Sequence, residues 1–167
     1  MRSILRLSVF LVLLITSGTT QAAPPSNPSQ WALGFMLGEP TGVSVKHWLG
    51  GSDAIDLGLG VGPGLRVHGD YLFGISRLAR DRTLKLDLYI GVGGAVSSGR
   101  GYCGWWRGGR YSPDGDPFLG VRVPFGLDLI LNRAPIELGL EMAPGLWVGE
   151  PGVATMFDVL FFLRFML

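Results

Sequence analysis

The sequence predicts an all-β protein, an eight-stranded antiparallel up-and-down transmembrane β-barrel. Composition is the first observation: of 167 residues, 47% are hydrophobic, 16% are charged and 27 are glycine, whereas a soluble domain carries about 25% charged residues and about 7% glycine. The second observation is that apolar and polar residues alternate in segments of strand length. The third is an N-terminal segment with the features of an export signal. The length suits a single domain.

Charge and cysteine content exclude several classes of protein. The formal net charge of +1 lacks the basic excess of a nucleic-acid-binding protein, so no nucleic acid partner is expected. The apolar content excludes an intrinsically disordered chain. Cys103 is the single cysteine of the sequence, so no intramolecular disulfide framework is expected. A membrane or secreted all-β protein remains.

The N-terminus predicts a cleaved signal peptide over residues 1–22. Arg2 and Arg6 precede an unbroken apolar run over 7–15, and small residues stand at the expected cleavage site after Ala22. An uncleaved anchor is the alternative, but nine apolar residues are too few for a helix that spans a bilayer, which needs about 20. We expect residues 23–30 to be a periplasmic leader and residues 31–167 to form the barrel.

Eight segments of strand length follow the leader, and each ends at a cluster of Gly, Pro, Asp or Asn residues, as expected for hairpins joined in a meander. They run over 31–38, 43–49, 54–62, 65–74, 83–95, 118–130, 135–143 and 153–166. Pro124 lies inside the sixth segment, where its missing N–H predicts a bulge or a local widening of the sheet.

The alternation assigns two faces to these strands in order. The first two expected strands, 31–38 and 43–49, are the shortest, and Lys46 lies on the polar face of the second. The third places leucine, isoleucine and valine opposite Asp56, and the fourth carries Arg66, His68 and Asp70 on its polar side. The last four repeat the pattern, with these charges opposite their apolar residues: Lys85 and Asp87, Arg122 and Asp128, Glu137 and Glu141, Asp158 and Arg164.

The composition of the polar face predicts that it points inward. A soluble barrel of the lipocalin kind would bury the apolar face and expose a polar surface rich in Lys, Glu, Thr and Ser. Here the uncharged positions of the polar face are mainly glycine, which suits a crowded interior. Buried charges need partners, so we expect a network of ion pairs inside the barrel, formed by Lys46, Asp56, Arg66, His68, Asp70, Lys85, Asp87, Arg122, Asp128, Glu137, Glu141, Asp158 and Arg164.

The lengths of the connections predict the orientation of the barrel. With both chain ends in the periplasm, the longest connection lies outside the cell, as is usual in outer-membrane barrels. The expected external connections are 39–42, 63–64, 96–117 and 144–152. The expected periplasmic turns are 50–53, 75–82 and 131–134.

The strand count, signal peptide, short turns and alternating last strand resemble the small outer-membrane β-barrel proteins of Gram-negative bacteria, of the OmpA-transmembrane or OmpX type. The C-terminus resembles the signal read by the outer-membrane assembly machinery, although its last residue is Leu rather than the usual Phe or Trp: Val159, Phe161, Leu163, Phe165 and Leu167. The segments 37–49, 54–56 and 68–72 are similar to a family of bacterial proteins of uncharacterised function. The resemblance implies an outer-membrane location, contact with outer-membrane lipids and the assembly machinery, and no catalytic residue.

The connection 96–117 is the candidate contact region on the outside. It interleaves arginines with aromatic residues, a combination that stacks on sugars and pairs with phosphates. An aromatic belt at the membrane interface is the alternative and the favoured reading. The residues concerned are Arg100, Tyr102, Trp105, Trp106, Arg107, Arg110 and Tyr111. The connection 144–152 is the second expected contact region.

Catalytic chemistry has weak support in the sequence. Ser44, His47, His68 and Asp70 are the members of a candidate nucleophile–base set. His47 falls on the apolar, lipid-facing side of its strand, and Ser44 lies on a different strand from His68 and Asp70, so nothing in the sequence brings the set together. No Cys/His cluster or phosphate-binding loop predicts a metal or cofactor. We therefore expect a structural or surface-interaction protein with a plugged interior. The alternatives are a small pore, a lipid-modifying enzyme and a soluble periplasmic ligand-binding barrel.

Overall fold

The computed structural model describes residues 31–62, 64–98, 102–103, 110–111, 117–149 and 152–167. The predicted signal peptide and leader lie outside these residues. The described chain is all-β, and it contains no helix long and apolar enough to cross a membrane. The strands are β1 (Trp31–Gly38), β2 (Thr41–Gly50), β3 (Asp53–Val61), β4 (Leu65–Arg80), β5 (Leu84–Ser98), β6 (Tyr102–Cys103), β7 (Arg110–Tyr111), β8 (Phe118–Arg122), β9 (Phe125–Leu131), β10 (Ile136–Gly149) and β11 (Gly152–Met166).

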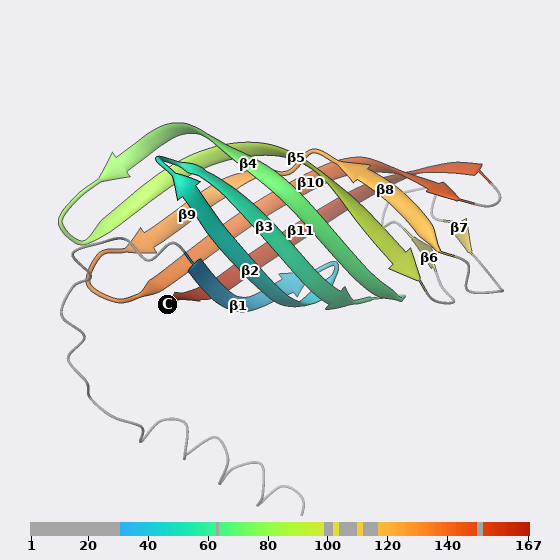
Figure 1. Cartoon of the computed structure of the whole chain (residues 1–167), viewed down its shortest axis with the longest axis horizontal. Helices are drawn as coiled ribbons and strands as arrows, with labels where there is room; N and C mark the ends of the chain where they lie inside the picture. The colour runs from blue at the N-terminus through green and yellow to red at the C-terminus, as the bar shows by residue number, and fades with distance from the viewer. Residues whose placement is uncertain (1–30, 63, 99–101, 104–109, 112–116, 150–151) are drawn as a thin grey trace, which may run out of the picture.

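Nine of these strands form one antiparallel sheet, and its pairings close into a ring. Each of β1 to β5 pairs with the next strand along the chain, and β11 pairs with both β10 and β1. Because β8 and β9 both lie between β5 and β10, the ring has eight positions. Figure 1 shows β11 ending beside the start of β1. We call this the terminal end of the ring, and the opposite end, where β5 ends and β8 begins, the loop end.

Pro124 divides the expected sixth strand into β8 and β9. Proline has no N–H for the ladder, although the carbonyl of Pro124 still accepts a hydrogen bond from the Gly91 N–H at 2.6 Å. The register is the same on both sides of the break, since Arg122 lies opposite Gly93 and Phe125 lies opposite Ile90. The predicted bulge is therefore wrong: the strand is interrupted without an inserted residue.

Several strands are longer than predicted. β4 continues to Arg80 with two register irregularities, so the turn expected over 75–82 is confined to 81–83. The external connection expected over 144–152 is wrong, because β10 extends to Gly149 and pairs there with Gly152 of β11. Pro144 and Gly145 resemble turn residues in the sequence, but Gly145 meets a neighbouring strand: an added Cβ would lie 2.2 Å from the Val121 carbonyl oxygen.

Side chains alternate between an apolar outer face and a charged interior, in the sense that the sequence predicts. On the outer face, Phe35, Leu57 and Val121 are 57%, 53% and 62% exposed. On the inner face, Asp56 and Glu137 have no exposed surface. The polarity of the molecule is therefore the reverse of that of a soluble protein, which buries its apolar residues.

The interior also contains apolar clusters, whereas the sequence predicts an inner face made mainly of charged residues and glycine. Phe118, Trp147 and Met156 pack together with Ala95 and Ala154 toward the loop end. Tyr89, Leu72 and Ala54 form a second cluster, with Trp48 against it, toward the terminal end. Met36, Leu160 and Phe162 form a third. All of these residues lie on the inward-pointing positions of their strands, so large apolar groups and charges share the interior.

Candidate functional site

The first group of interior charges, here the Lys46 cluster, is centred on Lys46 of β2 and Arg164 of β11. The Lys46 ammonium contacts Asp128 of β9 and lies 2.9 Å from Glu137 of β10. Arg164 pairs with the same Glu137 at 3.1 Å and with Asp56 of β3 at 2.6 Å. The cluster therefore connects strands on different sides of the ring.

Ser44 completes the Lys46 cluster. Its hydroxyl donates to Asp56 at 2.8 Å and accepts a hydrogen bond from Nε of Arg164 at 2.9 Å. Arg164 lies 3.9 Å from the ring centroid of Phe162 and thus also gains a cation–π contact. The Ser44 hydroxyl is thus hydrogen-bonded to Asp56 and Arg164, and not to His68 of the candidate set.

The second group, here the Arg122 cluster, surrounds Arg122 of β8. Its guanidinium contacts Glu141 of β10, lies 3.2 Å from Asp158 of β11 and lies 3.4 Å from Asp70 of β4. Arg66 of β4 reaches the other oxygen of Asp158 at 2.7 Å. One cation thus bridges three buried carboxylates that belong to three strands.

A smaller group lies at the terminal end. Lys85 and Arg77 both pair with Asp87, at 2.5 and 3.0 Å. The Lys85 and Arg77 side chains are 21% and 37% exposed, so these two cations form a rim above the buried Asp87. Arg77 was missed because its segment resembles a turn in the sequence, and only the extension of β4 brings it opposite Asp87.

The structure thus places twelve of the predicted network residues inside, at 8% exposure or less, and Lys85 at the rim: Lys46, Asp56, Arg66, His68, Asp70, Asp87, Arg122, Asp128, Glu137, Glu141, Asp158 and Arg164 are the buried ones. Seven of these carry carboxyl groups and four are Lys or Arg. Ion pairs among these buried side chains join strands at opposite positions of the ring, β2 with β9 and β4 with β11, which favours a closed interior.

His68 and Asp70 are packed against glycines on neighbouring strands. An added Cβ on Gly58 would lie 2.2 Å from a carbon of the His68 ring, and one on Gly93 would lie 1.9 Å from an oxygen of Asp70. In the described part of the chain neither nitrogen of His68 has a hydrogen-bond partner. The structure therefore does not join Ser44 and His68 by a hydrogen bond.

The close approach of Gly93 to Asp70 supports a stability prediction. Gly93→Ala is expected to lower the free energy of unfolding by about 1–3 kcal/mol, because the new methyl group also meets the backbone of the neighbouring strand. Gly94→Ala is the matched control, since its methyl group would lie 3.4 Å from the nearest atom. Urea unfolding in lipid or detergent measures both variants. Equal stability of the two variants would contradict this account of Gly93.

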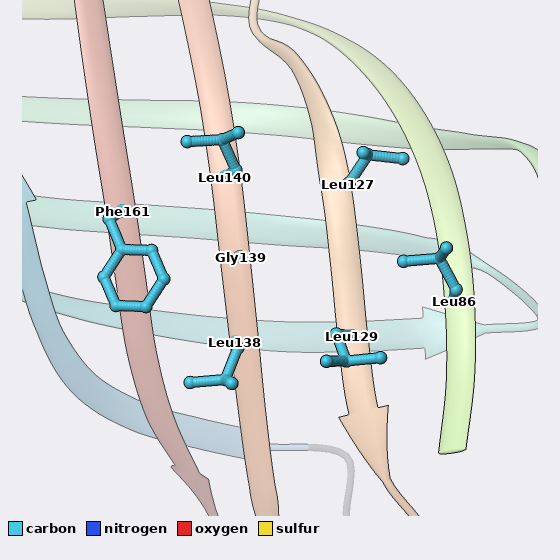
Figure 2. Close-up of a pocket in the computed structure, with 7 residues that line it drawn as sticks. All are labelled: Leu86, Leu127, Leu129, Leu138, Gly139, Leu140 and Phe161. Carbon is cyan, nitrogen blue, oxygen red and sulfur yellow. The ribbon is translucent and has the colours of Figure 1, made fainter.

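The outer face has a shallow apolar hollow, shown in Figure 2, of about 230 Å³. It crosses β5, β9, β10 and β11, on the half of the ring that leads to the terminal end. Its lining residues are Leu86, Leu127, Leu129, Leu138, Gly139, Leu140 and Phe161. With no polar side chain in its lining, the hollow suits a hydrocarbon chain better than a polar ligand.

The remaining candidate residues are placed as follows. Arg100, Trp105, Trp106 and Arg107 lie outside the described residues. For Tyr102, Arg110 and Tyr111 the structure gives the backbone, which pairs Tyr102 with Tyr111 and Cys103 with Arg110. The predicted assembly signal lies on β11, where Val159, Phe161 and Phe165 are 38%, 42% and 45% exposed, and Leu167 follows the strand at 75%.

Metal chemistry has no support in the described residues, which contain no group of three or more His, Cys, Asp or Glu side chains able to hold an ion. Comparison with protein families, curated proteins and solved structures finds no match to this chain.

Proposed function

We propose that this protein is an eight-stranded transmembrane β-barrel of the bacterial outer membrane, with a structural or surface-interaction role. The observation that carries the proposal is the reversed polarity of the ring: apolar side chains cover its outside, and its charged side chains lie inside, together with smaller apolar clusters. Monomeric soluble proteins rarely expose an apolar patch larger than a few hundred Å². A bilayer would cover this surface.

The backbone is also suited to a bilayer. Hydrocarbon offers no hydrogen bonds, so a spanning structure must satisfy its own N–H and C=O groups, as helices and closed sheets do. The pairing of β1 with β11 leaves the sheet without a free first or last strand. The strands of the ring other than the divided pair β8 and β9 have 8–16 residues, compared with the about 9–11 that a tilted strand needs to cross.

The proposed location of the protein and its proposed partners are inferred from the sequence. The expected signal peptide provides export, and the alternating pattern of β11 provides recognition by the outer-membrane assembly machinery. In the proposed orientation the terminal end faces the periplasm and the long connection after β5 faces outward. That connection, over 99–117, is the proposed contact region for a surface ligand, and outer-membrane lipids surround the ring.

Cell fractionation with gel mobility provides the test. The proposal expects recovery in the outer membrane, together with a difference in gel mobility between unheated and boiled samples, because a folded ring is more compact than the unfolded chain. Recovery as a soluble, heat-insensitive protein would contradict the proposal. It would instead favour the soluble ligand-binding alternative.

A filled interior predicts that the protein does not conduct ions. Trp147 has no exposed surface and packs with Phe118 toward the loop end, and the two charge clusters lie on the inward positions of the strands between this apolar cluster and the terminal end. We expect no single-channel current from the purified protein in a planar bilayer. Stable currents that scale with the amount of inserted protein would favour the small pore instead.

A further inference from the structure

Two turns at the terminal end are tied to each other. The Asn132 N–H donates to the Thr83 carbonyl at 2.9 Å, and the Asn132 side-chain amide donates to the Asp81 carbonyl at 2.7 Å. These bonds hold the turn 81–83, between β4 and β5, against the turn between β9 and β10. Arg82 and Arg133 are exposed residues of the two turns. The tie therefore fixes two cationic residues on one surface.

This surface holds a group of cations beside the carboxylates of Asp81 and Asp87. Among the Lys and Arg residues whose side chains the structure describes, those outside the interior all lie at the terminal end: Arg77, Arg80, Arg82, Lys85 and Arg133. Arg77 and Lys85 are paired with Asp87. Within the described residues no ion pair joins Arg82 or Arg133 to a carboxylate, so their charge is available to an external anion.

Two of the strands that line the apolar hollow of Figure 2, β5 and β9, lead from it to the tied turns. Leu86 lies four residues after Arg82, and Leu129 lies four residues before Arg133. At about 3.3 Å per residue, each arginine lies about 13 Å along the strand from the hollow. The surface thus combines two cations with a hydrocarbon-sized depression, in the order in which a phospholipid presents its phosphate and its acyl chain.

We propose that an anionic phospholipid binds here, with its phosphate at Arg82 and Arg133 and one acyl chain along the hollow. Guanidinium groups match phosphate oxygens with paired hydrogen bonds, and basic clusters beside an apolar band bind anionic headgroups. The inference rests on the proposed function, because only a ring that spans a bilayer presents its apolar face to acyl chains. It adds a lipid class and a position to that function.

Native mass spectrometry of the full chain, purified in detergent, tests the site. The probes are phosphatidylglycerol and phosphatidylcholine with identical acyl chains. The wild-type protein is expected to retain phosphatidylglycerol in preference to phosphatidylcholine. The double variant Arg82→Gln/Arg133→Gln is expected to reduce this preference about tenfold or more, since each surface arginine adds to the attraction for an anionic headgroup.

Three further variants separate the effect of charge from the effect of the apolar hollow. Asp81→Asn, in the same turn, removes a negative charge and is expected to keep or strengthen the preference. Leu129→Trp fills the hollow and is expected to lower retention of both lipids, whereas Leu57→Trp on the outer face of β3 is expected to leave retention unchanged. Equal retention of the two lipids by the wild type, or an unchanged preference in the double arginine variant, would overturn the site.

Insertion into pure phosphatidylcholine vesicles, followed by protease protection and gel mobility, distinguishes this failure from failure of the proposed function. A protein that does not insert would contradict the barrel proposal itself. A protein that inserts normally but shows no arginine-dependent lipid preference would contradict the lipid site and leave the barrel proposal in place.

Discussion

Leu57→Lys is expected to destabilise the protein in a lipid bilayer by about 2–4 kcal/mol, because a lysine at the middle of the apolar band would lie in hydrocarbon. Leu57 is in the centre of β3 and 53% of its surface is exposed. Because the Leu57 side chain lies on the outer face, the substitution removes no contact inside the ring. The loss of stability would come from placing an ammonium group in the lipid that surrounds the protein. Reversible urea unfolding in vesicles, followed by tryptophan fluorescence, measures the effect.

Val61→Lys provides the matched control. Val61 ends the same strand and is 62% exposed, so its lysine would lie near the membrane boundary, where the expected cost is about 0–1 kcal/mol. A soluble ring would tolerate lysine equally at both positions. Similar stabilities of the two variants would therefore contradict the membrane proposal and leave the fold unaffected.

Arg122→Met is expected to lower the free energy of unfolding by about 3–5 kcal/mol, since removal of one partner leaves buried carboxylates uncompensated. Arg122 contacts Glu141, Asp158 and Asp70 without exposed side-chain surface of its own. Methionine is unbranched like arginine but shorter, so the variant loses the charge together with the hydrogen bonds that the guanidinium donates to Glu141 and Asp158. The measurement is urea unfolding of the refolded protein, compared with the wild type.

Two further variants control the Arg122 experiment. Arg77→Met removes the half-exposed partner of Asp87 at the rim and is expected to cost about 1 kcal/mol or less, as exposed pairs do. The double variant Arg122→Met/Glu141→Gln is expected to be less destabilised than the two single effects combined, because the two residues interact directly. Additive effects would contradict the Arg122 cluster.

The sequence predicts the two faces of the sheet because alternation is a local property. In a strand, successive side chains point to opposite faces, so each of Asp56, Arg122 and Glu137 is assigned to the inner face from its nearest neighbours alone. Alternation alone does not say which of the two faces points inward. The abundance of glycine on the polar face predicts that this face is the inner one. The glycines at 58 and 93 indeed make room for His68 and Asp70.

The partners of each charge are not predictable in this way. Lys46 meets Asp128, a residue 82 positions away along the chain, and the pairing depends on the register of all intervening strands and on the width of the ring. The interior position of Trp147 was missed because the Pro144 and Gly145 beside it resemble a turn. In the closed sheet these two residues are paired with Phe157 and Met156 of β11.

The two charge clusters have a consequence for assembly. A strand that slips by one residue exchanges its faces, so a shift of β3 would carry Asp56 to the outside and bring Ile55 or Leu57 toward Arg164. A misaligned β3 would thus leave a carboxylate on the apolar outer face and Arg164 without the acid it pairs with. The ion pairs of the two clusters form only in the native register, so they favour this register over one shifted by a residue.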